Sequence, residues 1–131
     1  AWSVVQVQTG LPQVQADADL LRQLFINLIG NALKFSGDRS SPHVEVGAEL
    51  QQGEWVVFVS DNGVGLTPQQ ASQLFQPFRR VHGAHFEGHG VGLSIVKRVV
   101  DRHQGRIWVH TAPGEGARFC FTLGSSPVQR S

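Results

Sequence analysis

The most informative absences from this sequence are those of cysteine, net charge and long apolar runs. The single cysteine, Cys120, cannot form a disulfide within the chain, which is consistent with the cytosol. The formal net charge of +1 gives no basic excess to meet nucleic-acid phosphates in bulk, so we expect no nucleic-acid partner. No apolar run is long enough to span a bilayer and no signal peptide is present, so we expect a cytoplasmic domain without direct membrane contact.

The residues that are present suit one folded domain. Hydrophobic residues make up 40% and charged residues 16%, which argues against disorder, and 131 residues suffice for one core but not for two. Cys120 alternates with Phe119 and Phe121, which predicts a buried, reduced thiol. The chain begins with Ala1 rather than methionine, so we expect a fragment of a longer protein that is either soluble or membrane-anchored. We expect the domain to occupy residues 1–124 and the tail, 125–131, to be disordered.

Hydrophobic periodicity and turn signals predict an α/β fold. We expect a two-layer sandwich, in which three helices cover one face of a mixed five-stranded sheet. Thr67, Pro68 and Gln70 combine a capping box with a proline in the first turn, which predicts a helix start. Gly105 is expected to end the last helix. The predicted strands are 2–9, 43–50, 54–61, 105–111 and 117–123, the predicted helices are 17–35, a short one from 67, and 91–105, and the predicted long loop is 76–90.

The helix predicted for 17–35 carries polar residues on its apolar side. At about 100° per residue, Asn31 falls inside the apolar stripe, and Asn27 and Lys34 lie along its margin. A buried amide without partners costs roughly 1–3 kcal/mol. Either such an asparagine bonds a neighbouring loop, or the aligned amides and ammonium bind a metal–nucleotide, since an amide oxygen suits Mg²⁺ and an ammonium suits phosphate. The stripe itself consists of Leu20, Leu21, Leu24, Leu28, Ala32 and Phe35.

A first glycine segment, DNGVGL (61–66), directly follows a predicted strand. Asp61 ends that strand, where its carboxylate can accept a hydrogen bond from an exocyclic amine such as that of adenine. Gly63 and Gly65 allow a sharp turn and the close approach of a ligand. A solvated turn capped by Asp61 is the equally weighted alternative.

A second glycine segment, GHGVGL (88–93), opens a predicted helix. Gly88, Gly90 and Gly92 leave backbone N–H groups free to point at an anion, which a helix N-terminus favours. A glycine-rich hinge is the alternative. The pattern matches neither the Rossmann fingerprint nor the P-loop.

The predicted loop between the two glycine segments has glycines at its ends and charges in its middle, as a closing lid requires. His82, His85 and His89 have a spacing that suits zinc, but a glycine-rich loop offers little to orient the ligands. We therefore favour a solvated face. The other charged residues of the loop are Arg79, Arg80 and Glu87.

Taken together, these segments resemble the catalytic and ATP-binding domain of sensor histidine kinases, in the GHKL superfamily that includes DNA gyrase B and the large heat-shock chaperones. The resemblance covers about residues 2–123. NLIGNALKFS is similar to the family's asparagine segment, DNGVGL to its first glycine box, LFQPFRR to its phenylalanine box, and GHGVGLSIVKRVVDRHQGRIWV to its second glycine box. The segment RRVHGAHFEGHGVGL looks most like the corresponding segment in kinases of the phytochrome-related type.

The resemblance implies roles for individual residues. Asn31 would be the Mg²⁺ ligand, with Asn27 assisting near the phosphates. Lys34 and the lid residue Arg80 would contact phosphate and offset developing charge, so that Asn27, Lys34 and Arg80 form the implied catalytic set. The implied ATP-binding residues are Asn31, Lys34, Phe35, Asp61, Gly63, Gly65, Arg80, Gly88, His89, Gly90, Val91, Gly92 and Leu93, and Phe75 and Phe78 would anchor the lid.

One residue choice, at Asn27, and two departures from the family pattern refine the resemblance. The position of Asn27 is typically a water-activating glutamate in the gyrase and chaperone branches, and a neutral amide is a poor base, so hydrolysis should be suppressed. His89 stands where threonine is common in the family, and its imidazole would add a titratable donor near the phosphates. No histidine lies in a phosphoacceptor motif, so the resemblance implies that the acceptor helices lie upstream.

The implied function is that of a protein histidine kinase, whose ATP-binding domain holds Mg-ATP for γ-phosphoryl transfer to a histidine on an upstream dimerisation domain. The implied cofactors are ATP and Mg²⁺, and the implied partners are that phosphoacceptor domain, a response regulator and a second copy in a full-length homodimer. The fragment alone should not autophosphorylate. Three alternatives stay open: an inactive nucleotide-binding regulatory module, a self-contained gyrase-type ATPase, and a serine kinase acting on an anti-sigma antagonist.

Overall fold

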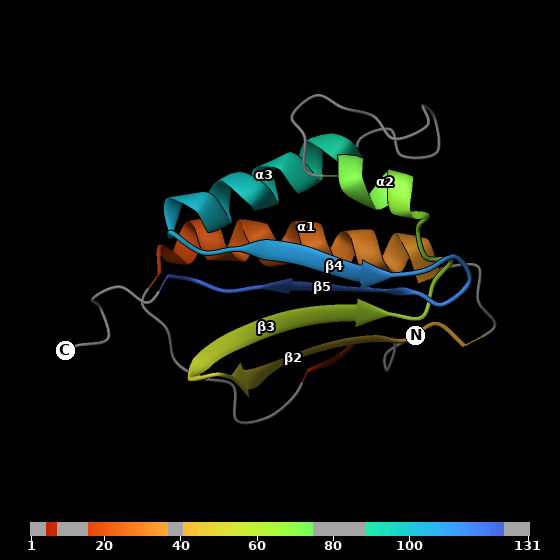
Figure 1. Ribbon diagram of the computed structural model, residues 1–131, viewed down its shortest axis with the longest axis horizontal. Coiled ribbons are helices and arrows are strands. Elements are labelled where there is room, and N and C mark those ends of the chain that lie inside the picture. Colours follow the sequence, from red (N-terminus) through yellow and green to blue (C-terminus); the bar gives the residue numbers. More distant parts are fainter. Residues whose placement is uncertain (1–4, 8–15, 37–40, 75–88, 125–131) are drawn as a thin grey trace.

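The computed structural model describes residues 5–7, 16–36, 41–74 and 89–124, and this part of the chain is an α/β fold (Figure 1). The α/β class predicted from the sequence is therefore confirmed. Most of the predicted loop and the predicted tail lie outside the described residues. The elements are β1 (Val5–Val7), α1 (Ala18–Ser36), β2 (Val44–Gln51), β3 (Glu54–Asp61), α2 (Pro68–Gln73), α3 (His89–Arg102), β4 (Ile107–Thr111) and β5 (Ala117–Phe121).

The strands form one sheet in the order β1-β2-β3-β5-β4. The last four of these are joined by antiparallel pairing into an open sheet, and the short β1 pairs parallel with β2 at the edge. Because β5 lies between β3 and β4, its first residue, Ala117, pairs with the last residues of both neighbours, Asp61 and Thr111. The end of β3 and the β4–β5 turn therefore meet at one edge of the sheet.

Helix α1 packs its apolar stripe on the sheet, and α3 packs against α1 on the same side (Figure 1). The helix begins after Asp17, whose Oδ1 accepts hydrogen bonds from the backbone N–H groups of Asp19 and Leu20, as an N-cap does. The predicted stripe is confirmed, because all six of its residues belong to the core or pack against it. Of these, Leu24, Leu28 and Ala32 are fully buried.

The start of α2 follows the predicted capping box. The hydroxyl of Thr67 accepts a hydrogen bond from the Gln70 N–H at 3.1 Å, and the Gln70 side chain accepts one from the Thr67 N–H at 2.9 Å. Pro68 occupies the first turn, where its missing N–H has no partner to lose.

Helix α3 differs from its prediction at both ends. It begins at His89, so His89 and Gly90 are helical rather than part of the predicted loop. It ends at Arg102, because Gln104 takes a left-handed φ of 61° and the Gly105 N–H bonds to the Val100 carbonyl at 3.0 Å. Gly105 follows the turn instead of making it. It is required because a Cβ there would collide with the Thr122 carbonyl oxygen.

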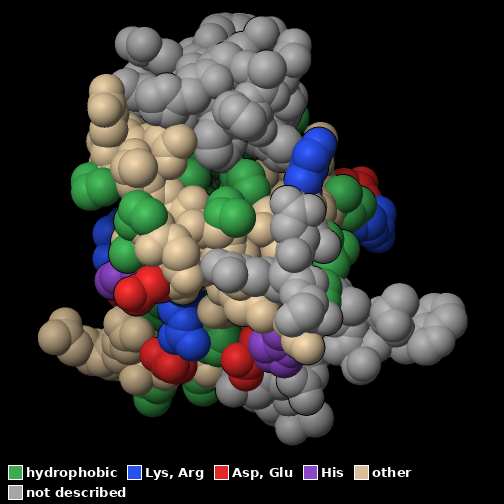
Figure 2. Space-filling view, turned by 90° about the vertical axis from the view of Figure 1, so that its right-hand side faces the viewer, with side chains coloured by type: hydrophobic (Ala, Val, Ile, Leu, Met, Phe, Trp, Pro, Cys, Tyr) green, Lys and Arg blue, Asp and Glu red, His purple; other side chains and the backbone are tan. Residues whose placement is uncertain are grey.

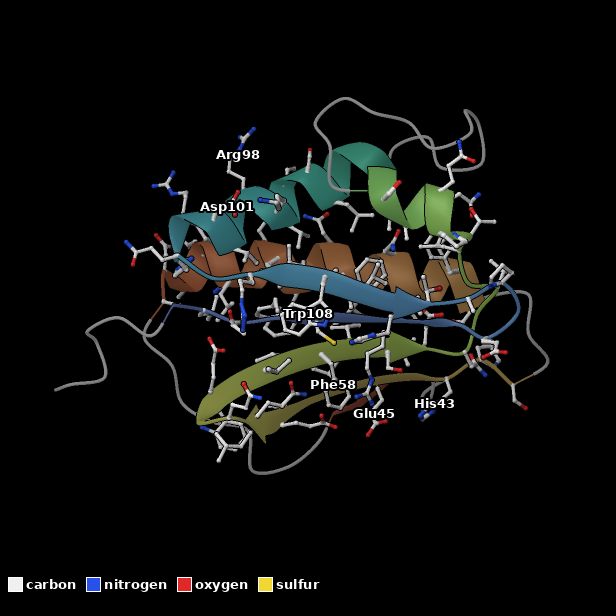
Figure 3. All side chains as sticks on the ribbon, viewed as in Figure 1. His43, Glu45, Phe58, Arg98, Asp101 and Trp108 are labelled. Atoms are coloured by element: carbon white, nitrogen blue, oxygen red, sulfur yellow. The ribbon has the colours of Figure 1, made fainter. Side chains whose placement is uncertain are left out.

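The opposite face of the sheet carries a second apolar cluster, which its own long side chains cover. Phe58 and Trp108 lie on this face (Figure 3). The guanidinium of Arg118 lies 3.9 Å from the centroid of the Phe58 ring. Phe58 and Cys120 are consequently buried without a described helix above them. The prediction of a buried, reduced thiol at Cys120 is confirmed.

None of the described helices has the length and apolar character needed to cross a membrane.

Candidate functional site

The candidate site lies at the end of the molecule where α1, β3 and β4 all end. Figure 2 shows this end, with hydrophobic side chains near the middle of the face and charged side chains of both signs around them. The sheet order explains the convergence, because Asp61 at the end of β3 lies beside the β4–β5 turn, while α1 crosses above β3.

Asn31 is the first unusual group at this end. Its side chain is 5% exposed, and within the described residues neither its Oδ1 nor its Nδ2 has a hydrogen-bond partner. A buried amide without hydrogen bonds destabilises the folded state, because its desolvation penalty is not offset by a protein partner. Of the two interpretations left open by the sequence, the described residues provide no support for an asparagine bonded to a neighbouring loop. A bound ligand would supply the partners that the described residues lack.

Asn27 and Lys34 line the margin of α1, as predicted. Asn27 is half-buried and Lys34 is exposed, one turn before and about one turn after Asn31. Lys34 also lies in the last turn of α1, where a cation interacts favourably with the helix dipole. The same edge of α1 therefore carries two amides and one exposed ammonium.

Asp61 is the second unusual group. Its side chain is 7% exposed, its Oδ1 accepts the Gly63 N–H at 2.7 Å, and its Oδ2 has no partner among the described residues. Burial raises the pKa of Asp61 above the ordinary value of 3.8, and hydrogen bonds from the backbone of Gly63 and Ala117 oppose that rise. A buried acceptor oxygen without a donor suits an incoming amino group.

Gly63 brings the strand that carries Asp61 against the helix that carries Asn31. A Cβ at Gly63 would collide with the carbonyl oxygen of Phe35 and would lie 2.9 Å from Asp61 Oδ1. Phe35 follows Asn31 by one helical turn and packs, half-buried, against the core. Only glycine lets the loop after β3 come this close to the end of α1.

Gly65 has a different role from Gly63, because it turns the chain. Its φ of 73° lies in the left-handed region, and a Cβ there would collide with the Ala112 carbonyl oxygen of the β4–β5 turn. The two glycines of the first segment thus fix the loop on opposite sides, against α1 and against the turn.

The sequence did not lead us to two further residues at this edge, Asn62 and Thr111. Asn62 donates from Nδ2 to the Ser41 carbonyl at 2.7 Å and accepts the His43 N–H at Oδ1 at 2.9 Å, so it ties the end of β3 to the segment before β2. The available signal was its place beside Asp61 in DNG. Thr111 gave no sequence signal, because its partners are distant in the chain.

The remaining predicted site residues are only partly described. Arg80 and Gly88 lie outside the described residues, as do His82 and His85 of the zinc alternative. The backbone of His89–Gly92 forms the first turn of α3, which agrees with a glycine segment that opens a helix. Leu93 is 1% exposed and belongs to the hydrophobic core. No group of His, Cys, Asp or Glu in the described ranges is arranged to hold a metal ion.

The chemistry of the described donors fits Mg-ATP. Asn31 offers a neutral hard oxygen suited to Mg²⁺. Asp61 offers an unpartnered buried acceptor suited to the amino group of adenine. Lys34 offers an exposed ammonium suited to phosphate.

A family model described as histidine kinase-, DNA gyrase B- and HSP90-like ATPase matches residues 16–127. The chain belongs to this family. Membership confirms the predicted GHKL resemblance, and the family's ATPase character supports ATP as the nucleotide of this domain.

Relatives of this chain include phytochromes and a histidine kinase. Phytochrome-like protein Cph1 of Synechocystis sp. is 41% identical over 92% of this chain, and cyanobacterial phytochrome A of Nostoc sp. is 45% identical over 86% of it. Methanogenesis regulatory histidine kinase FilI of Methanothrix harundinacea is 40% identical over 91% of the chain. The chain spans only 13–16% of the length of these three relatives. The predicted similarity to phytochrome-related kinases is confirmed.

Solved histidine kinases share the fold of this family member. The catalytic domain of histidine kinase ThkA matches with a TM-score of 0.75 and 26% identity, covering 94% of this chain and 79% of that one. Mycobacterial sensor histidine kinase MprB matches with a TM-score of 0.74 and 29% identity, covering 91% of this chain and 80% of that one. Full-length ShkA, solved in complex with AMPPNP, matches with a TM-score of 0.72 and 31% identity over 95% of this chain and 26% of that one.

Proposed function

We propose that this chain is the ATP-binding catalytic domain of a two-component sensor histidine kinase, which holds Mg-ATP for γ-phosphoryl transfer to a histidine on an upstream dimerisation domain. The observation that carries the proposal is a pair of buried polar groups, the Asn31 amide and the Oδ2 of Asp61, which lack partners among the described residues. Two such groups at one end of a small domain are costly unless a ligand satisfies them.

Each described residue has a task in this proposal. Asn31 Oδ1 would hold Mg²⁺, and Asp61 Oδ2 would accept the adenine amino group, with Gly63 leaving room for the base. Lys34 would follow the phosphates from the exposed edge of α1. When bound, Mg-ATP supplies the transferable phosphoryl group. The protein supplies positioning and charge, which are the main requirements of phosphoryl transfer.

Asn27 favours transfer over hydrolysis. It is half-buried on the same edge of α1 as Asn31. The gyrase and chaperone branches typically carry a water-activating glutamate at this position. An amide cannot accept a proton at neutral pH, so bound ATP should persist until an acceptor arrives.

The domain bounds, the lid, the cellular location and the partners are part of the same proposal. We infer that residues 1–124 form the catalytic and ATP-binding domain, with a mixed five-stranded sheet, three helices on one face and an ATP lid loop that brings Arg80 to the phosphates. His89, Gly90, Val91, Gly92 and Leu93 would close the phosphate side through their backbone. The cytoplasmic location, the homodimer of the full-length parent and onward transfer to a response regulator are predictions of the same kind.

Phosphotransfer in trans tests the proposal. The chain is mixed with labelled ATP, Mg²⁺ and a separately purified phosphoacceptor domain of the parent protein, with Asn31→Ala as the inactive control. We expect label on the acceptor that is stable to alkali and lost in acid, as a phosphohistidine is. The same label should be absent with Asn31→Ala and absent when the acceptor histidine is replaced by glutamine.

The other outcomes identify the alternatives. ATP binding without transfer to the acceptor would contradict the kinase and support an inactive regulatory module. Release of phosphate by the chain alone would support a gyrase-type ATPase. Acid-stable label on a serine of an anti-sigma antagonist, with none on the histidine, would support a serine kinase.

A further inference from the structure

The loop that follows Asp61 is held by the β4–β5 turn at several points. The Gly114 N–H bonds to the Val64 carbonyl at 2.6 Å, and Gly65 packs against the Ala112 carbonyl so closely that a Cβ would not fit. The loop after Asp61, whose carboxylate is the proposed acceptor for the adenine amino group, therefore takes its shape from a turn some fifty residues further along the chain.

Thr111, the last residue of β4, adds a side-chain link to this contact. Its hydroxyl donates to the Gly116 carbonyl at 2.7 Å and accepts the Leu66 N–H at 3.0 Å. A threonine hydroxyl has one proton to donate, so both bonds fix its orientation. Leu66 ends the loop and is buried in the core, so this bond ties one end of the loop to the sheet.

The other bond of Thr111 leads to Asp61. Gly116, whose carbonyl receives the hydroxyl proton, has a φ of 76°, and a Cβ there would collide with the Asp61 carbonyl oxygen and lie 3.1 Å from Asn62 Cα. The backbone of Gly116 is thus pressed against the residue that bears the buried carboxylate. The Thr111 hydroxyl therefore contacts both the β4–β5 turn, through Gly116, and the loop that follows Asp61, through Leu66.

We propose that Thr111 is a positioning residue that sets the direction of the Asp61 carboxylate and so the preference of the site for adenine. This inference rests on the proposed ATP site. Without the hydroxyl, the Leu66 N–H and the Gly116 carbonyl lose a partner, and the loop gains freedom on both sides of Asp61. The hydrogen bond that an adenine amino group would make to Asp61 then loses its alignment.

Two nucleotides and three variants test the role of Thr111. The affinities of a non-hydrolysable ATP analogue and of its inosine counterpart, which has no amino group at position 6, are measured by calorimetry. We expect Thr111→Val to reduce the preference for the adenine nucleotide by about three- to tenfold, the effect of losing one hydrogen bond. Thr111→Ser, which keeps the hydroxyl, should retain the preference.

Thr122→Val is the matched control. Thr122 is buried, and its hydroxyl accepts the Arg106 N–H at 3.0 Å at the other end of the β4–β5 pair. Its loss should lower the melting temperature without changing the adenine preference. If Thr111→Val does not fold, Thr111→Cys replaces it, because a thiol is a weak donor and a weak acceptor.

The outcomes separate the inference from the function on which it rests. Equal weakening of both nucleotides by Thr111→Val, or no change in their ratio, would overturn the positioning role while leaving the ATP site intact. If the unmodified chain binds neither nucleotide, the proposed function fails before Thr111 is considered.

Discussion

Asn31 and Asp61 are placed where function and stability conflict. The Asn31 amide and the Oδ2 of Asp61 are buried without partners among the described residues, and each weakens the unliganded fold. Replacing either should therefore stabilise the empty protein and weaken nucleotide binding. A polar group with only a structural task would show the opposite effect on stability.

For Asn31, we expect Asn31→Leu to raise the free energy of unfolding by about 1–3 kcal/mol, because an apolar side chain has no desolvation penalty at this position. The same variant should not bind the ATP analogue. Urea unfolding monitored by tryptophan fluorescence gives the first quantity, and calorimetry gives the second. A less stable Asn31→Leu would show that the amide is already satisfied in the protein.

For Asp61, the effect should depend on pH. Burial raises the pKa of Asp61 above 3.8, so the native state keeps a proton that the unfolded chain has already lost. Stability from this group therefore falls as the pH rises from 3.8 through the raised pKa, and the loss persists at neutral pH. We expect Asp61→Asn to melt higher than the unmodified chain at pH 7, and the difference to vanish in acid. A difference that is constant with pH would contradict this explanation.

The sequence predicted where Asn31 and Asp61 lie, but not whether their polar atoms have hydrogen-bond partners. Helical periodicity placed Asn31 inside the apolar stripe, and the strand pattern placed Asp61 at a strand end. Whether either group has a partner depends on loops that meet it only in the folded chain, such as the contact of Gly63 with Phe35. Thr111 escaped notice for the same reason, since Leu66 is far from it in sequence.

At the scale of elements, we expect alanine substitutions at two glycines, one on α1 and one beside it, to change stability in opposite directions. Gly30 lies on the exposed side of α1 with no atom within 4 Å of an added Cβ, whereas a Cβ at Gly63 collides with the end of that helix. We expect Gly30→Ala to stabilise the protein by roughly 0.5–1 kcal/mol, with unchanged nucleotide affinity.

Gly63→Ala should destabilise the protein by about 1–3 kcal/mol through overpacking. It should also weaken nucleotide binding, because the loop and α1 must separate. Thermal unfolding and calorimetry on both variants check the pair. A neutral Gly63→Ala would mean that the end of α1 yields easily and that the loop contact does not shape the site.

The boundaries of α3 show why element ends are harder to predict than element types. The sequence pointed to Gly105 as the helix stop because glycine is the usual left-handed residue there. The structure gives that conformation to Gln104 and needs Gly105 for its close approach to Thr122. The competing constraint comes from β5, which local sequence signals do not include. The capping box at Thr67 is purely local, and there the prediction was right.

At the scale of the whole molecule, the strand order lies beyond local patterning. Periodicity predicted the strands, but not that β5 would insert between β3 and β4 and bring the β4–β5 turn beside Asp61. The face of the sheet opposite α1 is sealed by its own side chains, with Arg118 over Phe58 and Arg106 paired with Glu54 at 2.6 Å. Within the described residues, the buried side-chain atoms without partners belong to Asn31 and Asp61, at the end of the molecule where we propose that the nucleotide binds.

The most direct test of the proposed Mg-ATP site is a calorimetric titration of the chain with a non-hydrolysable ATP analogue, with and without Mg²⁺, beside Asn31→Ala. We expect micromolar binding that strengthens with Mg²⁺ and is lost in the variant. Absence of binding, or binding that is indifferent to both Mg²⁺ and Asn31, would contradict the assignment of this end of the molecule as the Mg-ATP site.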